Sequence, residues 1–167
     1  MAEKTILFVC TGNTCRSVMA EAMAKEYLAQ LKQEKPKVRV MSAGTGAIPG
    51  EPASEYTLAA LSHMGINFDG HKARSIRPEL IGEADVILVM TNRHKEHILN
   101  LAPDAKNKVY LLKAYASDNE EKNEDVCDDG NAEIMDPFGL SLGHYRVCAG
   151  QLQAFVNKAL DRLFTDK

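Results

Sequence analysis

The sequence predicts an α/β fold, a single three-layer domain with a central four-stranded parallel sheet flanked by helices on both faces. Short apolar runs alternate along the chain with longer segments of helical periodicity, an order typical of βαβ units. In the runs at residues 5–9 and 86–90, apolar and polar residues do not alternate, which indicates strands buried on both faces. The chain has 167 residues, of which 45% are hydrophobic, enough for the core of one domain. We therefore expect residues 1–167 to form one domain.

The first half of the chain contains two expected strands and two expected helices. Residues 5–9 and 38–41 are short runs rich in β-branched and other apolar side chains, and they predict strands. Helical spacing of methionine, alanine and leucine side chains predicts a helix over residues 17–32, with Ser17 as its N-cap. Residues 54–64 predict a second helix, which ends at a glycine.

The second half repeats this order. Residues 86–90 are wholly apolar and predict a third strand, and residues 109–112 predict a fourth. A helix is expected over residues 93–101, because Pro103 just beyond it is a stop signal. A long apolar stripe predicts the last helix over residues 142–164. Right-handed crossovers between the strands would place helices on both faces of the sheet.

Composition argues against several classes of partner. The formal net charge is −3, from 20 basic and 23 acidic residues, so charge gives no reason to expect nucleic acid or a membrane as partner. No apolar run reaches the roughly 18–20 residues of a membrane-spanning helix, and the N-terminus lacks the features of a signal peptide. We therefore expect a cytoplasmic protein. Residues 117–135 hold eight acidic residues and one basic residue and predict a solvated surface loop.

Neither the cysteines nor the histidines have the spacing of a metal site. The four cysteines are too few for a disulfide scaffold and lack the paired spacing of a zinc site, so each is either buried or chemically active. They are Cys10, Cys15, Cys127 and Cys148. Among the five histidines, His94 and His97 come closest to a ligand spacing, but we expect them on a solvated helix face. We expect no metal and no cofactor.

The strongest chemical signal is Val-Cys-Thr-Gly-Asn-Thr-Cys-Arg-Ser, residues 9–17, between the first strand and the first helix. Ligands of parallel sheets bind at the carboxyl ends of the strands, and a helix N-terminus there binds anions. Gly12 lets the turn close tightly, and Arg16 can hold two oxygens of a phosphate. The turn is not a nucleotide-binding P-loop, because no Gly-Lys-Ser/Thr follows the glycine.

Cys10 lies at the base of this turn. The helix N-terminus and Arg16 favour its thiolate form, and Ser17 could donate a hydrogen bond to the sulfur. A thiolate inside an anion-binding turn predicts nucleophilic attack on phosphorus, with a cysteinyl-phosphate intermediate. On spacing and placement alone, the alternative is a buried cysteine beside an ordinary surface arginine.

Two motifs together are more specific than either alone. Cys-Thr-Gly-Asn-Thr-Cys-Arg-Ser near the N-terminus and Asp-Pro-Phe-Gly at residues 136–139 resemble the low-molecular-weight protein tyrosine phosphatase family. The resemblance spans essentially the whole chain and includes Ser-Ala-Gly-Thr at residues 42–45 and Gly-His-Lys-Ala-Arg at residues 70–74.

This resemblance implies roles for individual residues. Cys10 would be the nucleophile, and Arg16 would clamp the phosphoryl oxygens. Asp136 would be the general acid that protonates the leaving group and then the base that activates water. The implied substrate-binding residues are Thr11, Gly12, Asn13, Thr14, Cys15 and Ser17, and the implied supporting residues, which help Asn13 to hold the loop, are Ser42 and His71.

Thr14 bears on the choice of substrate. Tyrosine-directed members of the family usually carry a larger aliphatic residue there, whereas threonine resembles the bacterial protein arginine phosphatases. A hydroxyl can accept a hydrogen bond from the N–H groups of phosphoarginine, which an aliphatic side chain would leave unpaired at about 1–3 kcal/mol. Gly139 points the same way, because tyrosine-directed relatives typically have aromatic residues after Asp-Pro. The resemblance therefore implies a phosphatase acting on phosphoarginine in proteins, with a tyrosine phosphatase as the alternative.

Three other functions remain open. An arsenate reductase of similar fold is a lesser alternative, because those enzymes use extra cysteines in mid-chain and residues 85–100 contain none. A non-catalytic phosphate-binding module would need neither Cys10 nor Asp136. In this family a pair such as Cys10 and Cys15 can form a protective disulfide, which implies a peroxide-responsive switch with Cys15 as the resolving partner. We expect phosphorylated proteins as partners and a monomeric chain.

Overall fold

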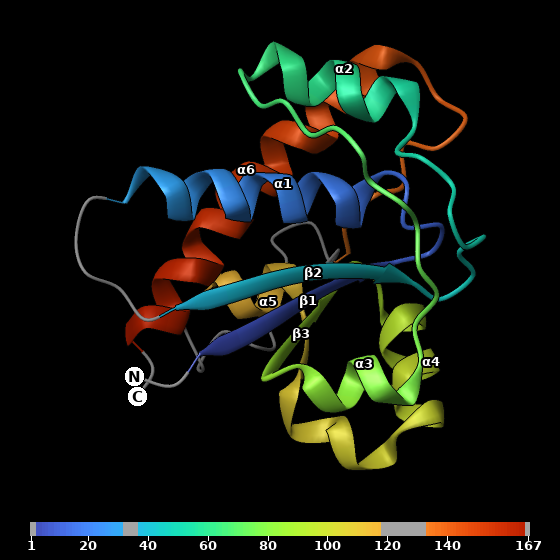
Figure 1. Ribbon diagram of the computed structural model, residues 1–167, viewed down its shortest axis with the longest axis vertical. Coiled ribbons are helices and arrows are strands. Elements are labelled where there is room, and N and C mark those ends of the chain that lie inside the picture. The colour runs from blue at the N-terminus through green and yellow to red at the C-terminus, as the bar shows by residue number, and fades with distance from the viewer. Residues whose placement is uncertain (1–2, 32–36, 118–132, 166–167) are drawn as a thin grey trace.

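A four-stranded parallel sheet forms the centre of the structure, with strand order β2-β1-β3-β4 (Figure 1). The computed structural model describes residues 3–31, 37–117 and 133–165. The strands are β1 (Lys4–Cys10), β2 (Val38–Gly44), β3 (Val86–Val89) and β4 (Val109–Leu111). The α/β fold expected from the sequence is confirmed, and all four expected strands are present.

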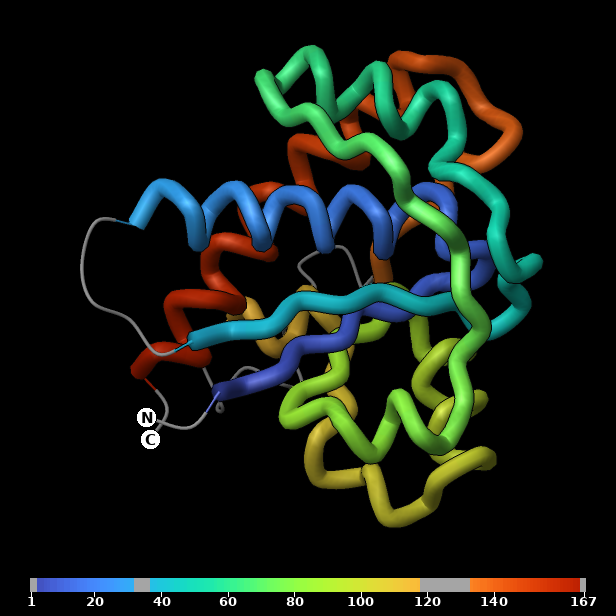
Figure 2. Tube along the Cα trace, viewed as in Figure 1, coloured from blue at the N-terminus to red at the C-terminus, as the bar shows by residue number. Residues whose placement is uncertain are grey.

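Helices cover both faces of this sheet. They are α1 (Arg16–Gln30), α2 (Glu55–His63), α3 (Pro78–Glu83), α4 (Asn92–Leu101), the 3-10 helix η1 (Pro103–Lys108), α5 (Leu112–Ala116) and α6 (Leu142–Thr165). Helices α1 and α6 lie on one side of the sheet, and α3 and α4 lie on the other (Figures 1 and 2). Within the described residues, no helix is both long and apolar enough to span a membrane.

Successive side chains of β1 face the two helical layers in turn. Ile6 and Phe8 belong to the core shared with α1, α5 and α6, whereas Leu7 and Val9 belong to the core shared with α3 and α4. Each of these four side chains is at most 1% exposed. Burial on both faces requires the continuous apolar run that predicts this strand.

The sequence does not predict three short helical segments, α3, η1 and α5. They contain 6, 6 and 5 residues, too few to show a helical period. Pro78 and Pro103 stand at the start of α3 and η1, where a missing N–H group is tolerated. Pro103, which the sequence predicts as a stop signal for the helix before it, therefore also begins a helical turn. The expected acidic loop over residues 117–135 lies outside the described residues except at its ends, as does Cys127.

The start of α1 corrects one expectation. Helix α1 begins at Arg16, its N-cap is Cys15, and no side chain caps it. Ser17 is therefore not the N-cap: it lies inside the first turn, and its hydroxyl contacts Cys10 and Asn13. The uncapped backbone N–H groups at this end remain available to an anion.

The carboxyl ends of β1 and β2 lie side by side, with Cys10 opposite Gly44. The Thr45 N–H donates to the Cys10 carbonyl oxygen, and the Gly46 N–H donates to the Thr11 carbonyl oxygen, each at 2.9 Å. A Cβ atom at Gly44 would lie only 2.4 Å from the Thr11 carbonyl oxygen. Glycine at this position therefore allows the loop after β1 to pack against the end of β2.

We predict that Gly44→Ala lowers the free energy of unfolding by about 1–3 kcal/mol, because the added methyl group must displace backbone rather than a flexible side chain. Urea unfolding followed by circular dichroism measures the change. The control is Gly150→Ala in α6, where a Cβ meets nothing within 4 Å and alanine should stabilise the helix by about 0.5–1 kcal/mol. Equal stability of Gly44→Ala and wild type would contradict the close approach.

Candidate active site

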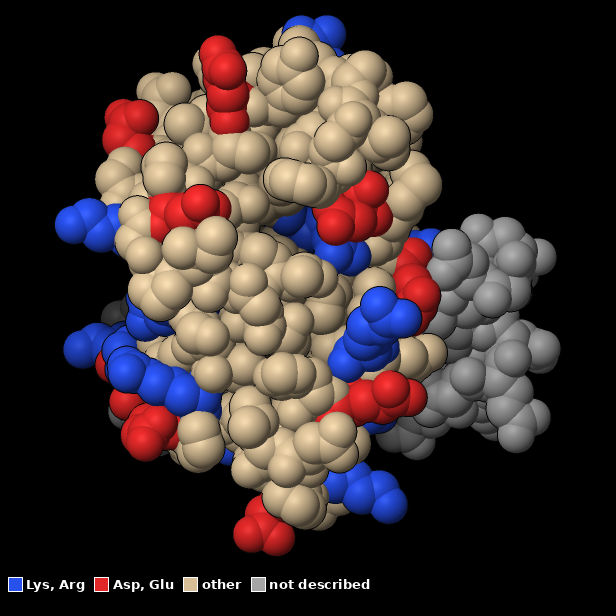
Figure 3. Space-filling view, turned by 90° about the vertical axis from the view of Figure 1, so that its right-hand side faces the viewer, with Lys and Arg blue, Asp and Glu red and all other residues tan. Residues whose placement is uncertain are grey.

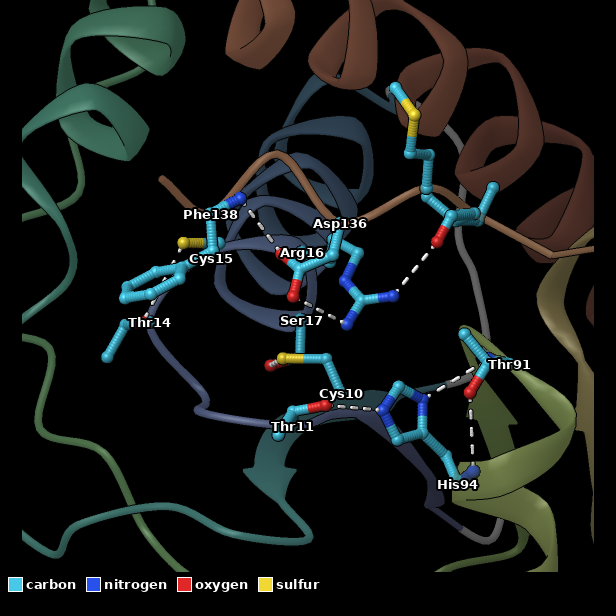
Figure 4. Close-up of polar contacts among 12 residues, drawn as sticks. Cys10, Thr11, Thr14, Cys15, Arg16, Ser17, Thr91, His94, Asp136 and Phe138 are labelled. Carbon is cyan, nitrogen blue, oxygen red and sulfur yellow. Dashed lines mark hydrogen bonds and ion pairs between the residues drawn. The ribbon is translucent and has the colours of Figure 1, made fainter. Parts of the chain in front are cut away.

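The sulfur of Cys10 lies in the loop that connects β1 to α1, which we call the nucleophile loop (residues 10–16) (Figure 4). Cys10 is the last residue of β1 and is only 2% exposed. Its Sγ lies 2.9 Å from the hydroxyl oxygen of Ser17, so the contact expected between these two residues is present. The start of α1 and the side chain of Arg16 lie on the same side of the loop (Figure 4).

Asn13 holds the nucleophile loop in shape. Its φ of +54° lies in the left-handed region, which an L-residue adopts when local contacts support it. The buried side chain supplies them: Nδ2 donates to the hydroxyl oxygens of Ser17 and Ser42, each at 2.9 Å. Its Oδ1 accepts the Arg74 N–H at 3.0 Å, and its carbonyl oxygen lies 2.8 Å from His71 Nε2. The expected contacts of Asn13 with Ser42 and His71 are therefore present.

Glu21 sets the direction of these hydrogen bonds. The Ser42 hydroxyl donates to Glu21 Oε1 at 2.5 Å, so its oxygen is free to accept the N–H of Asn13. Asn13 also donates to the Ser17 oxygen, which leaves the Ser17 hydrogen to donate to the Cys10 sulfur. A hydrogen-bond donor that faces the sulfur can stabilise negative charge on it during attack.

Arg16 is buried and lies beside Asp136 (Figure 4). Its Nη2 is 3.4 Å from Asp136 Oδ2, and its Nη1 donates to the Ile134 carbonyl oxygen at 2.9 Å. The other carboxylate oxygen of Asp136 accepts the Phe138 N–H at 3.1 Å. The buried Nε of Arg16 has no hydrogen-bond partner among the described residues. Because an unpaired buried N–H costs about 1–3 kcal/mol, a phosphoryl oxygen bound here would stabilise the site.

A pocket of about 220 Å³ lies at this end of the sheet. It is lined by Cys10, Thr11, Gly12, Thr14, Cys15, Arg16, Gly46, Ile48, Glu51, Asp136 and Phe138. The space-filling view shows Lys or Arg atoms next to Asp or Glu atoms in a hollow of this face (Figure 3). The remaining expected site residues, Asn13, Ser17, Ser42 and His71, do not line the pocket but support the nucleophile loop through the contacts above.

Several residues of the site are not predicted by the sequence. Gly46, Ile48 and Glu51 follow β2 and carry no motif that would place them beside Cys10. Glu51 is exposed, and among the described residues its carboxylate makes no ion pair. Glu21 is only 6% exposed. Its position as an acidic residue in an otherwise apolar stretch of α1 is the one feature of the sequence that could indicate a buried polar contact there.

His94 corrects a second expectation, because it does not lie on a solvated helix face. Its side chain is 3% exposed, and its Nε2 lies 2.9 Å from the Thr11 hydroxyl oxygen. Burial, and then the positive charge of Arg16, lower the pKa of His94 from 6.5 to about 4. Within the described residues, no group of three or more His, Cys, Asp or Glu side chains could hold a metal ion.

The three described cysteines, Cys10, Cys15 and Cys148, are free thiols. Cys15 Sγ lies 3.5 Å from the hydroxyl oxygens of both Ser54 and Tyr145. Burial, and then the hydrogen bond with Cys15, raise the pKa of Tyr145 to about 12. Burial raises the pKa of Cys148 to about 12, so this thiol stays protonated at neutral pH. The disulfide between Cys10 and Cys15 stays a prediction.

Comparison with known proteins gives the family. A family model described as low molecular weight phosphotyrosine protein phosphatase matches residues 5–167. The chain belongs to this family. One relative of this phosphatase, a protein-arginine-phosphatase from Geobacillus stearothermophilus, is 34% identical, and the match covers 97% of each chain. Another, the low molecular weight protein-tyrosine-phosphatase Wzb of Escherichia coli K12, is 35% identical over 81% of this chain and 79% of the relative.

Several solved structures of phosphatases superpose well on this chain. A YwlE arginine phosphatase in which serine replaces the active-site cysteine, and in which that serine is phosphorylated, superposes with a TM-score of 0.84. The two chains are 31% identical, and the match covers 98% of this chain and 97% of the other. The phosphatase therefore shares its fold with arginine and tyrosine phosphatases alike.

We predict that His94 makes the phosphatase less stable in acid. Between pH 6.5 and 4 this histidine is protonated in the unfolded chain but not in the folded chain. The free energy of unfolding therefore decreases as the pH is lowered from 6.5 to 4, and His94 contributes roughly 2–3 kcal/mol to this decrease. The nearby charges are Arg16, Arg93 and His97, which lower its pKa, and Asp136, which raises it.

Urea unfolding of wild type and His94→Gln at pH 7 and pH 4 measures this effect. The variant should lose less stability than wild type over that interval, because glutamine does not titrate. His63→Gln, which replaces an exposed histidine of α2, is the matched control. The same pH dependence in His94→Gln and wild type would show that His94 is not held neutral by the fold.

Proposed function

We propose that this phosphatase removes phosphate from phosphoarginine in proteins through a cysteinyl-phosphate intermediate. The observation that carries the proposal is the convergence of Cys10, Arg16 and Asp136 on one pocket. A nucleophile, an anion clamp and an acid are together there, whereas a phosphate-binding module would need only the clamp. A relative that covers the same length of chain is named a protein-arginine-phosphatase, which supports this substrate.

In the first step, the Cys10 thiolate attacks phosphorus, and the phosphorus–nitrogen bond breaks as the sulfur–phosphorus bond forms. The uncapped N-terminus of α1 and the guanidinium of Arg16 stabilise the charge on the phosphoryl oxygens. Asp136 gives its proton to the departing nitrogen, so that arginine leaves as a guanidinium rather than as a strong base.

In the second step, the Asp136 carboxylate takes a proton from water, and the water oxygen attacks phosphorus. The sulfur–phosphorus bond breaks, inorganic phosphate is released, and Cys10 returns to the thiolate form. The Asp136 side chain is 45% exposed, so water can reach it. The phosphorylated active-site serine of a YwlE variant supports a covalent route of this kind.

The part of the pocket that would hold the leaving group has polar and apolar walls. A guanidinium is flat and cationic, with N–H donors on its edges and apolar faces. The Thr14 hydroxyl and the Glu51 carboxylate offer acceptors for those edges. Ile48 and Phe138, which are 63% and 71% exposed, offer surfaces for the faces.

A tyrosine phosphatase is the second candidate. Phe138 favours it, because an aromatic side chain at the pocket can pack against the ring of phosphotyrosine. Glu51 favours phosphoarginine, because a phenyl ring carries no positive charge to complement a carboxylate. An arsenate reductase stays a lesser alternative, since residues 85–100 contain no cysteine.

We further propose that the chain works as a monomer, as one domain over residues 1–167, in the cytoplasm. The nucleophile, the clamp and the acid of the proposed mechanism all belong to this chain, so the mechanism requires no second copy. Free thiols suit a reducing compartment. Phosphorylated proteins are the partners that a protein phosphatase requires.

We predict that Cys10→Ser abolishes phosphate release and that Asp136→Asn lowers kcat by about 10²–10⁴-fold, because asparagine can neither protonate the leaving group nor activate water. Phosphate release from a phosphoarginine peptide measures both. Asp104→Asn, an exposed change in η1, is the control for Asp136→Asn. Full turnover by either site variant would rule out this mechanism.

We predict that Thr14→Ile lowers the ratio of kcat/KM for phosphoarginine to kcat/KM for phosphotyrosine by about 10-fold, because the guanidinium N–H groups lose an acceptor. Matched peptides that carry one or the other phosphorylated residue provide the measurement. Thr14→Ser keeps the hydroxyl and should keep the ratio near that of wild type. If Thr14→Ile leaves the ratio unchanged, the hydroxyl does not select the substrate.

A further inference from the structure

His94 is a buried histidine that the mechanism above does not use. It lies in the first turn of α4, and its ring points at Thr11 of the nucleophile loop (Figure 4). The two residues are 83 positions apart in the sequence, so the contact joins two separate βα turns at the same edge of the sheet. Thr11 lines the pocket, and His94 itself does not.

The hydrogen bonds of His94 fix its tautomer. The backbone N–H of Thr91 donates to His94 Nδ1 at 3.2 Å, so Nδ1 carries a lone pair. The ring hydrogen of neutral His94 is therefore on Nε2, which donates to the Thr11 hydroxyl oxygen at 2.9 Å. A pKa of about 4 keeps this ring neutral near pH 7, so the direction of the bond does not change.

The hydroxyl of Thr11 thus accepts one hydrogen bond from His94 and can still form others. A hydroxyl donates one hydrogen bond and accepts two. His94 uses one of the two acceptor positions, and among the hydrogen bonds of the described residues the hydroxyl has no other partner. One donor and one acceptor therefore remain on a residue that lines the pocket. A threonine without this partner would rotate about χ1, and its hydroxyl would have no fixed direction.

We propose that Thr11 is a specificity-determining residue that recognises the phosphorus–nitrogen linkage of phosphoarginine, and that His94 is the positioning residue that orients its hydroxyl. This inference rests on the proposed phosphoarginine activity. In that linkage a phosphoryl oxygen, which accepts, lies next to an N–H group, which donates. The Thr11 hydroxyl can donate to the first and accept from the second.

Phosphotyrosine does not match this hydroxyl in the same way. Its bridging atom is an oxygen without hydrogen, so the remaining acceptor position of Thr11 finds no donor. A site built to pair with an N–H group discriminates against a ligand that lacks it, because the protein group is left unpaired. Thr11 and Thr14, on the two sides of Gly12, would then both accept from the leaving group.

The test compares kcat/KM for phosphoarginine and phosphotyrosine peptides in Thr11→Val, His94→Leu and the double variant. Each single change should lower the phosphoarginine-to-phosphotyrosine ratio by about 10-fold. The double variant should be no worse than Thr11→Val, because His94 acts only through Thr11. Thr11→Ser and His94→Gln keep the hydroxyl and the N–H donor, and they should restore most of the ratio.

Three outcomes separate this inference from the proposed function. If wild type does not hydrolyse phosphoarginine, the proposed function fails. If wild type hydrolyses it but the variants lower both activities equally, His94 and Thr11 are merely structural and the inference is wrong. If His94→Leu does not fold, as circular dichroism would show, Thr11→Val alone decides, because Thr11 is exposed and its replacement leaves the core intact.

Discussion

The side-chain amide of Asn13 has two hydrogens, and both form hydrogen bonds. One goes to Ser42, whose own hydrogen is held by the Glu21 carboxylate, and the other goes to Ser17, whose hydrogen is then left for the Cys10 sulfur. The same buried amide thus supports the left-handed backbone of the loop and orients the donor that faces the nucleophile. The shape of the loop and the hydrogen bond to the Cys10 sulfur are two results of one network.

The parallel sheet brings the other groups to this network. Strands that run in the same direction end at the same edge, so the turns after β1, β2 and β3 meet there. Cys10 ends β1 and Arg16 begins α1, while Glu51 lies in the segment after β2. His94 lies in the first turn of α4, the helix that follows β3. Gly44 lets the first two turns approach closely, since any side chain there would meet the Thr11 carbonyl oxygen.

The sequence predicts those parts of the structure that depend on local patterns. Apolar runs gave the strands, and the short loop motif gave Cys10 and Arg16 at a strand–turn–helix junction. His94 and Glu51 could not be predicted, because their partners lie far away in the sequence and nothing local marks them. The prediction that Ser17 caps α1 is wrong for a related reason: serine near a helix start usually caps the helix, but here its hydroxyl contacts Cys10 and Asn13.

The proposed nucleophile and the proposed acid are held in different ways, which suits the different tasks proposed for them. Cys10 is 2% exposed and fixed by a strand end, because attack on phosphorus requires one geometry. The Asp136 side chain is 45% exposed, and among the described residues its hydrogen bonds and ion pairs are those with Arg16 and the Phe138 N–H. An acid that first gives a proton to a leaving group and then takes one from water must be open to both. A rigid sulfur and an accessible carboxylate therefore let one small pocket perform both steps.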